Sequence, residues 1–591
     1  MQKSVFLFLL ASLAGFSVSG CSNMMTDNDA QPEPAEPAAA EKSAEVQAIT
    51  ATESEIEVDY AEFEPETLYL LMAAEIAAQR GHYDVTLANY SEAARQSRDP
   101  GVIERAMKIA QSLNANNAQR QLASLWLEVD PDSLQAHRAA AIQNVKQNKL
   151  PAALGHMEQI LDRGGDADFD SLAALGASLP EPDREKLLKL YRELEERHPN
   201  NQEIQYSIAL LLKITGDPEA ALDKLEPLLK ETPEFQPALV LKGDLLYQIG
   251  KEKEALNHLL RNTRRYPDNR QMGTLYGRML ISEDELRAAQ DEFDRLMQRF
   301  PDAPGLQLSH ALVALENGET ETAREDLAQL IEQGQRTDDA HYYLGRIEDQ
   351  AGNVDAAITH YEQVEKGQHF LPALARLSTL KAKTGRLEEA RQTLQTLREN
   401  NPGEAQSLWL LEVNLLLDAN NPEEALNVAN EALKAYPGNA RILYARAMLL
   451  DSRGELEAAE RDLRTIIELQ PDNAVALNAL GYILATRTER LDEARNLIEK
   501  ALRIEPENPA ILDSMGWVLF QQGEIDQALT YLRRAYEDFP DPEVAAHLGE
   551  ALWVNGQRDQ AKMIWRESMD SHDDIEVIQE TIERLDVESS E

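Results

Sequence analysis

The sequence predicts an all-α protein, a superhelical solenoid built from about fifteen helix pairs. Three observations lead to this fold class. An alanine recurs at intervals of 33, 34 or 35 residues, prolines recur with the same period, and no stretch alternates apolar and polar residues as a strand does. The recurring alanines are Ala221, Ala255, Ala289, Ala323, Ala357, Ala390, Ala425, Ala459, Ala494, Ala528 and Ala561.

The start of the chain has the layout of a secretion signal. Lys3 precedes a largely apolar run at residues 5–18, and two small residues follow directly before Cys21. The run of about fourteen residues is shorter than the roughly twenty that a membrane-spanning helix needs. We therefore expect residues 1–20 to be a signal peptide that is removed. The alternative is a free cysteine beside a simple cleavage site.

Cys21 is the only cysteine of the 591 residues, so no disulfide can form within the chain. The segment "VSGC" resembles the bacterial lipobox, whose cysteine becomes the acylated first residue of the mature protein. That resemblance implies lipidation of Cys21, and Ser22 implies sorting to the outer membrane, at its periplasmic face. Two or more acyl chains anchor a protein stably, whereas a single chain binds only marginally.

The composition of residues 21–63 predicts a tether behind the lipidated cysteine. The segment is rich in Pro, Ala, Glu, Ser and Thr and has few large apolar residues. Such a segment buries too little surface to offset the entropy of ordering, so we expect it to be disordered. Its length of about forty residues lets the folded part stand clear of a bilayer.

Residues 64–574 carry the repeats, and "PENPAILDSMGWVLFQQGEIDQALTYLRRAYEDFP" at 506–540 shows one in full. Leu512, Gly516 and Leu519 share one face of a first helix, and Ala528 follows on a second. This pattern resembles the tetratricopeptide repeat. Small residues allow the two helices to approach closely, and proline cannot continue a helix. The closing prolines are Pro199, Pro233, Pro267, Pro301, Pro402, Pro437, Pro471, Pro506 and Pro540. We expect a capping helix and tail at residues 575–591.

Composition and motifs argue against several kinds of function. There are 58 Lys and Arg against 104 Asp and Glu, a formal net charge of −46, and such a surface repels nucleic acid. The histidines are scattered singly, no metal-binding spacing of His or Cys occurs, and there is no phosphate loop or nucleophile elbow. We therefore expect no cofactor, no metal and no enzymatic activity.

The first helices of the C-terminal repeats carry aromatic and polar residues beside their core stripe. Such residues are typical of interface hot spots, which makes them candidates for partner binding. Packing between adjacent repeats is the alternative role for the same side chains. The candidates are Asp513, Trp517 and Phe520, then Asn478 and Tyr482 one repeat earlier, and Trp553 one repeat later.

Longer segments carry a closer resemblance, among them "PETLYLLMAAEIAAQR", "AHYYLGRIEDQAG" and the repeat quoted above. They resemble the large outer-membrane tetratricopeptide lipoproteins of Gram-negative bacteria that act as adaptors for a periplasmic carboxyl-terminal processing protease. The resemblance implies binding to that protease and help in degrading peptidoglycan hydrolases. The alternative is a structural scaffold in an envelope assembly or an exopolysaccharide-export machine.

The proposed register makes a prediction about stability. Ala494 stands where the two helices of a pair meet, so a leucine there overpacks the contact. We expect Ala494→Leu to lower the free energy of unfolding by about 1 to 3 kcal/mol, measured as a lower thermal midpoint. An unchanged midpoint would contradict the register.

Overall fold

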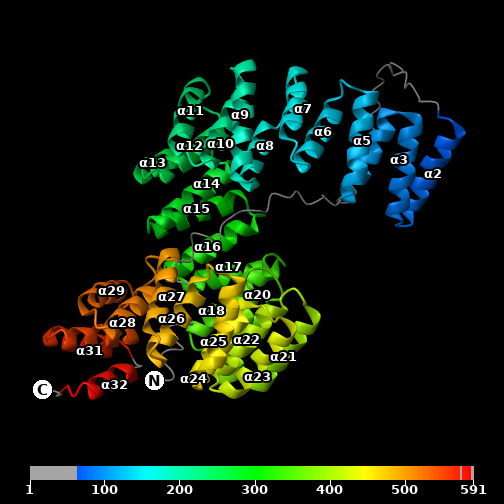
Figure 1. Ribbon diagram of the computed structural model, residues 1–591. Helices are drawn as coiled ribbons and strands as arrows, with labels where there is room; N and C mark the ends of the chain where they lie inside the picture. The colour runs from blue at the N-terminus through cyan, green and yellow to red at the C-terminus, as the bar shows by residue number, and fades with distance from the viewer. Residues whose placement is uncertain (1–62, 573–574, 588–591) are drawn as a thin grey trace. The chain divides into compact units, whose positions relative to one another are not determined.

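The computed structural model describes residues 63–572 and 575–587 (Figure 1). Over these residues the chain forms α-helices joined by short turns, with one short 3₁₀ turn and no strand. The helices α2 to α31 make fifteen consecutive pairs, and α32 follows them. The predicted all-α repeat architecture is therefore confirmed. Cys21, the signal segment 1–20 and residues 21–62 lie outside the described residues.

The chain divides into two compact units, with the boundary between Pro301 and Asp302. In the described part of the N-terminal unit, most helices pack against the next along the chain. Its helices are α2 Pro65–Gln79, α3 Tyr83–Ser97, α4 Pro100–Ser112, α5 Asn116–Val129, α6 Leu134–Lys146, α7 Leu150–Asp162, α8 Phe169–Leu175, α9 Glu181–Arg197, α10 Gln202–Ile214, α11 Pro218–Glu231, α12 Gln236–Gln248, α13 Glu252–Arg265, α14 Arg270–Ser282 and α15 Leu286–Arg299.

The C-terminal unit continues the same arrangement. First helices of neighbouring pairs also contact one another, as α26 does with α28 and α28 with α30. The helices are α16 Pro304–Glu316, α17 Thr320–Glu332, α18 Thr337–Gln350, α19 Val354–Tyr361, α20 Phe370–Lys383, α21 Leu387–Asn400, α22 Ala405–Asp418, α23 Pro422–Ala435, α24 Ala440–Ser452, α25 Leu456–Leu469, α26 Ala474–Arg487, α27 Leu491–Ile504, α28 Pro509–Gln521, α29 Ile525–Asp538, α30 Pro542–Val554, α31 Arg558–Ser571 and α32 Glu576–Arg584.

An asparagine caps the first helix of many pairs, two residues after the closing proline. The side chain of Asn439 accepts a hydrogen bond from the backbone N–H of Ile442 at 3.0 Å, and Asn473 accepts one from Ala476 at 2.9 Å. Each cap satisfies a backbone donor that the helix itself leaves unpaired. Proline and asparagine together therefore set both the end of one pair and the start of the next.

Many of the turns inside the pairs contain a residue in a backbone conformation that favours glycine. Gly250, between α12 and α13, has φ +75°, and Gly523, between α28 and α29, has φ +81°. Only glycine adopts this left-handed region without a steric cost. The glycines in these turns therefore follow the same period as the recurring alanines.

The two helices of a pair approach closely where the sequence has its small residues. All eleven recurring alanines are buried. A methyl group added at Gly516 would lie 2.5 Å from Leu532, and one at Gly481 would lie 2.5 Å from Ile498. The sequence interpretation of these positions is confirmed, because the neighbouring helix occupies the space that a larger side chain would need.

The N-terminal unit departs from regularity at one pair. Its first helix α8 is only seven residues long and continues as the 3₁₀ turn at Gly176–Ser178. The second helix α9 is correspondingly long, at 17 residues. Tyr191 of α9 donates a hydrogen bond to the carbonyl oxygen of Phe169 at 2.6 Å and closes the shortened pair.

The close contact between α30 and α31 leads to a testable prediction. A methyl group at Gly549 of α30 would lie 2.0 Å from Nε1 of Trp565, which is fully buried in α31. We expect Gly549→Ala to lower the free energy of unfolding by about 1 to 3 kcal/mol, measured by chemical denaturation. The matched control is Gly155→Ala in α7, where no atom lies within 4 Å of the new methyl group. Equal effects of both variants would argue against close packing at Gly549.

Candidate partner-binding site

The structure places the six predicted candidates on three first helices of the C-terminal unit. Asn478 and Tyr482 lie on α26, Asp513, Trp517 and Phe520 on α28, and Trp553 on α30. The first four are buried, whereas Phe520 and Trp553 are half-buried. Trp553 packs near Trp565, with ring centroids 6.0 Å apart, and the guanidinium of Arg558 lies 4.9 Å from its ring centroid.

Side-chain contacts link these three helices. Tyr482 of α26 donates a hydrogen bond to Oε1 of Glu543 on α30 at 2.5 Å. Nδ1 of His547 on α30 lies 2.9 Å from Oδ2 of Asp513 on α28. Trp517 stacks on the His547 ring, with centroids 4.0 Å apart. Asp513 therefore has a role between repeats, which is the alternative that the sequence left open, and partner binding by the six residues remains a prediction.

Tyr482 and Trp517 also line a cavity of about 260 Å³. Its walls come from the first helices α24, α26, α28 and α30 and from α32. The charged and polar members of the lining include Asp451, Arg487, Glu543, His547, Glu550 and Arg584. We refer to this space as the α26–α32 cavity.

Buried ionisable groups dominate the electrostatics of the α26–α32 cavity. Burial raises the pKa values of the Glu543 and Asp451 carboxyls. The pKa of His547 is also raised: burial alone lowers it, but the charge and hydrogen bond of Asp513 outweigh that effect, with the charges of Glu543 and Glu550 adding to the increase. The contact with Asp513 thus favours the protonated form of His547.

Three buried polar atoms around the cavity have no hydrogen-bond partner in the described part of the chain. They are Nε1 of Trp517, Oδ1 of Asp451 and Oδ1 of Asn478. Such atoms are uncommon in folded proteins and are costly to bury. Trp517 and Asp451 line the α26–α32 cavity itself.

Sequence reasoning missed the α30 residues of the cavity. Glu543, His547 and Glu550 are spaced i, i+4 and i+7, the same spacing as the predicted Asp513, Trp517 and Phe520. All three α30 residues are buried. The spacing alone could have found them, but the contribution of α32 has no sequence signal because α32 lies beyond the last full repeat.

A second candidate surface lies on α2, at the start of the described chain. The residues that α2 buries are small or polar, namely Thr67, Ala74 and Ala77. Four of its large apolar side chains are exposed instead, with Tyr69 at 72%, whereas Leu70 and Leu71 are partly buried against the core. We define the α2 apolar stripe as the exposed Leu68, Tyr69, Met72 and Ile76.

The described residues carry no group of three or more His, Cys, Asp and Glu side chains placed to hold a metal ion. Nor is any helix among them both long enough and apolar enough to cross a bilayer. Both candidate surfaces are suited to non-covalent binding. The α2 apolar stripe offers apolar side chains, and the α26–α32 cavity offers buried charges with unpaired hydrogen-bond groups.

Stacked helix pairs with such surfaces define a helical-repeat protein of the scaffold class. Two tetratricopeptide-repeat profiles match the chain, one at residues 350–411 and 485–550 and the other at 308–368, 410–474 and 444–509. A TPR repeat-containing protein of Pseudomonas aeruginosa is 40% identical over 551 residues, which are 93% of this chain and 90% of that protein. The chain belongs to the tetratricopeptide-repeat protein family.

More distant similarities were also found. Cellulose synthase operon protein C of Pseudomonas fluorescens is 24% identical over 332 residues, half of this chain but only 25% of that protein. Among solved structures, yeast Tom70 is 15% identical, covers 85% of this chain and 96% of its own, and has a TM-score of 0.32. A TPR protein of Thermus thermophilus is 21% identical, covers 31% and 100%, and has a TM-score of 0.29.

The His547–Asp513 pair makes a prediction about pH. The folded-state pKa of His547 is raised, so its stabilising contribution is fully present below the unfolded value of about 6.5 and is lost as pH rises through the folded value. We expect the difference in unfolding midpoint between wild type and His547→Gln to be larger at about pH 6 than at about pH 9. Chemical denaturation followed by tryptophan fluorescence measures it. A difference that grows with pH would contradict the ion pair.

Proposed function

We propose that this protein is a non-enzymatic adaptor, anchored in the outer membrane through the acylated Cys21, that binds a periplasmic carboxyl-terminal processing protease. In this proposal it brings the protease together with peptidoglycan hydrolases and promotes their degradation. Tetratricopeptide repeats form scaffolds for protein–protein interaction, and this general role is the foundation of the proposal. The partner and the location follow from the resemblances of the sequence, including the lipobox-like "VSGC".

The observation that carries the binding role is the α2 apolar stripe. Large apolar side chains are normally placed inside, yet α2 buries alanines and exposes a tyrosine, a leucine, a methionine and an isoleucine. A contiguous exposed apolar surface of this kind marks an interaction site, and aromatic anchors dominate interface energetics. We assign the α2 apolar stripe to the protease.

Binding two proteins at once is sufficient for this function without any chemistry by the scaffold. A protease held at one end of the repeats and a substrate held elsewhere meet at a high effective concentration. The lipid on Cys21 confines that encounter to the inner side of the outer membrane, and the acidic surface of the chain adds solubility and steers basic partners.

A second candidate function has one observation in its favour. The similarity to Cellulose synthase operon protein C suggests a scaffold of an exopolysaccharide-export machine. That similarity covers half of this chain and 25% of that protein, at 24% identity. Because it is confined to so small a share of that protein, the export scaffold stands second.

Purification of the full chain from detergent-solubilised membranes tests the proposal. We expect a carboxyl-terminal processing protease in the eluate, and we expect the double variant Tyr69→Glu/Met72→Glu to lower its recovery at least tenfold, because charge on the stripe opposes apolar contact. Both positions are exposed, so folding is little affected. The matched control is Leu469→Glu, which charges an exposed leucine on α25.

Three outcomes would contradict this assignment. A synthase or an outer-membrane pore in the eluate, without a protease, supports the export scaffold instead. Equal recovery of the protease by the double variant and by Leu469→Glu removes the α2 apolar stripe from the interface. Capture of lipids or vesicles alone by the stripe would make it a membrane contact.

A further inference from the structure

The α26–α32 cavity contains a buried carboxylate without a counter-ion. Glu543 is 5% exposed and accepts one hydrogen bond, from Tyr482 at 2.5 Å. In the described part of the chain, no nitrogen of Lys, Arg or His lies within 4 Å of its carboxylate. Burying a charge in this way is costly unless a cation pairs with it.

Two further groups in the cavity wall are incomplete. Nε1 of Trp517 is a donor without an acceptor, and the residue is 8% exposed. Oδ1 of Asp451 has no hydrogen bond, and the closest cation, Nε of Arg487, lies 3.6 Å away. A ligand that completed all three groups would carry positive charge with several donors and would also offer an acceptor.

The cations of the cavity wall each have a carboxylate partner, which for Arg487 is Asp451 in a long ion pair at 3.6 Å. Arg584 of α32 makes two hydrogen bonds to the Glu550 carboxylate, at 2.6 and 2.5 Å. His547 is paired with Asp513. The Arg584–Glu550 pair also shows, within the same protein, how a carboxylate of the cavity wall binds a guanidinium group. The two groups form two parallel hydrogen bonds.

The same pairing occurs three repeats earlier. Arg446 of α24 binds the two carboxylate oxygens of Asp462 on α25, at 2.7 Å each. The unit thus satisfies its buried carboxylates with guanidinium groups wherever its own sequence supplies one. Glu543 is a buried carboxylate for which the described chain supplies none.

We infer that the α26–α32 cavity binds an arginine side chain of a protein partner. The guanidinium pairs with Glu543 and Asp451, and a main-chain carbonyl next to that arginine accepts the hydrogen bond of Trp517 Nε1. A volume of about 260 Å³ is below that of most whole-ligand pockets and suits one side chain. The inference rests on the scaffold role within the proposed function, and it does not depend on the identity of the protease.

Burial raises the pKa of Glu543, and the charge of His547 together with the hydrogen bond from Tyr482 offsets that effect only in part, which agrees with this inference. An arginine in the cavity stabilises the charged form. An anionic side chain such as glutamate would add to the negative charge of Glu543 and Asp451, so it is disfavoured.

A fluorine NMR titration tests the inference on the full mature chain. The five tryptophans are replaced by 5-fluorotryptophan, and the resonance of Trp517 is assigned by its loss in Trp517→Phe. The probe is N-acetyl-arginine N-methylamide, which carries both a guanidinium and main-chain carbonyls. We expect a saturable shift of the Trp517 resonance, and no such shift with the citrulline analogue, which has the same shape without the charge.

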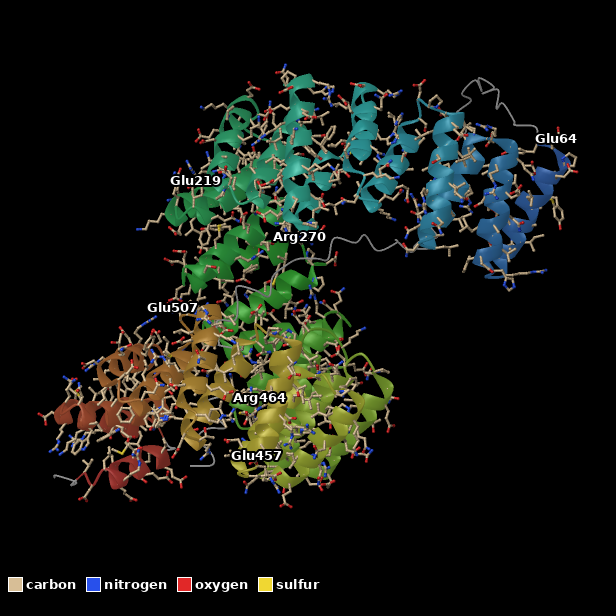
Figure 2. All side chains as sticks on the ribbon, viewed as in Figure 1. Glu64, Glu219, Arg270, Glu457, Arg464 and Glu507 are labelled. Carbon is tan, nitrogen blue, oxygen red and sulfur yellow. The ribbon has the colours of Figure 1, made fainter. Side chains whose placement is uncertain are left out.

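Variants connect that shift to the proposed contacts. We expect Glu543→Gln to weaken the apparent affinity for the probe at least tenfold, since it removes the charge and keeps the shape. The matched control is Glu457→Gln on α25, an exposed glutamate that is labelled in Figure 2. The unfolding midpoint of Glu543→Gln is measured alongside, and Asp451→Asn provides a second variant should that midpoint fall.

Several results would overturn the inference. These are the absence of a saturable shift, an equal shift with citrulline or with the lysine or glutamate analogue, and an equal effect of Glu543→Gln and Glu457→Gln. Recovery of the protease through the α2 apolar stripe is measured separately. Failure in the cavity and failure of the adaptor proposal are therefore distinguishable.

Discussion

The close approach of the two helices within each pair is the constraint on which the rest of the structure depends. It requires a side chain no larger than a methyl group at positions such as Ala494 and Ala528, and none at all at Gly516. The opposing side chain, Leu532 in the case of Gly516, then fills the space between the helices. Once each pair has this fixed geometry, the next pair packs against it in the same way, and its first helix is presented beside the previous one.

Much of the fold could be predicted because this constraint repeats in sequence. The alanines and closing prolines set the period from which about fifteen helix pairs were predicted, and the described helices agree with that number. The shortened pair around α8 and the left-handed Arg336 before α18 were not predicted, since each replaces the usual proline and cap by a local solution. The period of the sequence reflects the features that all helix pairs have in common. It therefore carries no information about individual connections such as these two.

The candidate site was predicted only in part, for a related reason. The stripe through Asp513 and Trp517 located the correct helix faces, but it could not show that Asp513 would be paired with His547 or that Tyr482 would reach Glu543. Those contacts join residues 34 and 61 positions apart, across one and two repeats. They depend on the angle between neighbouring pairs, which is set by packing. The α2 apolar stripe was not predicted, because the apolar residues of this helix do not reveal from sequence alone which of them a neighbouring helix covers.

The position of α32 has a consequence for the integrity of the α26–α32 cavity. Arg584, Val577 and Thr581 of this helix form one wall, while the remaining walls belong to repeats that are complete without it. Loss of α32 would thus leave every helix pair intact and still remove one wall of the α26–α32 cavity. The repeats and the cavity can therefore differ in stability, because only the cavity depends on this last helix.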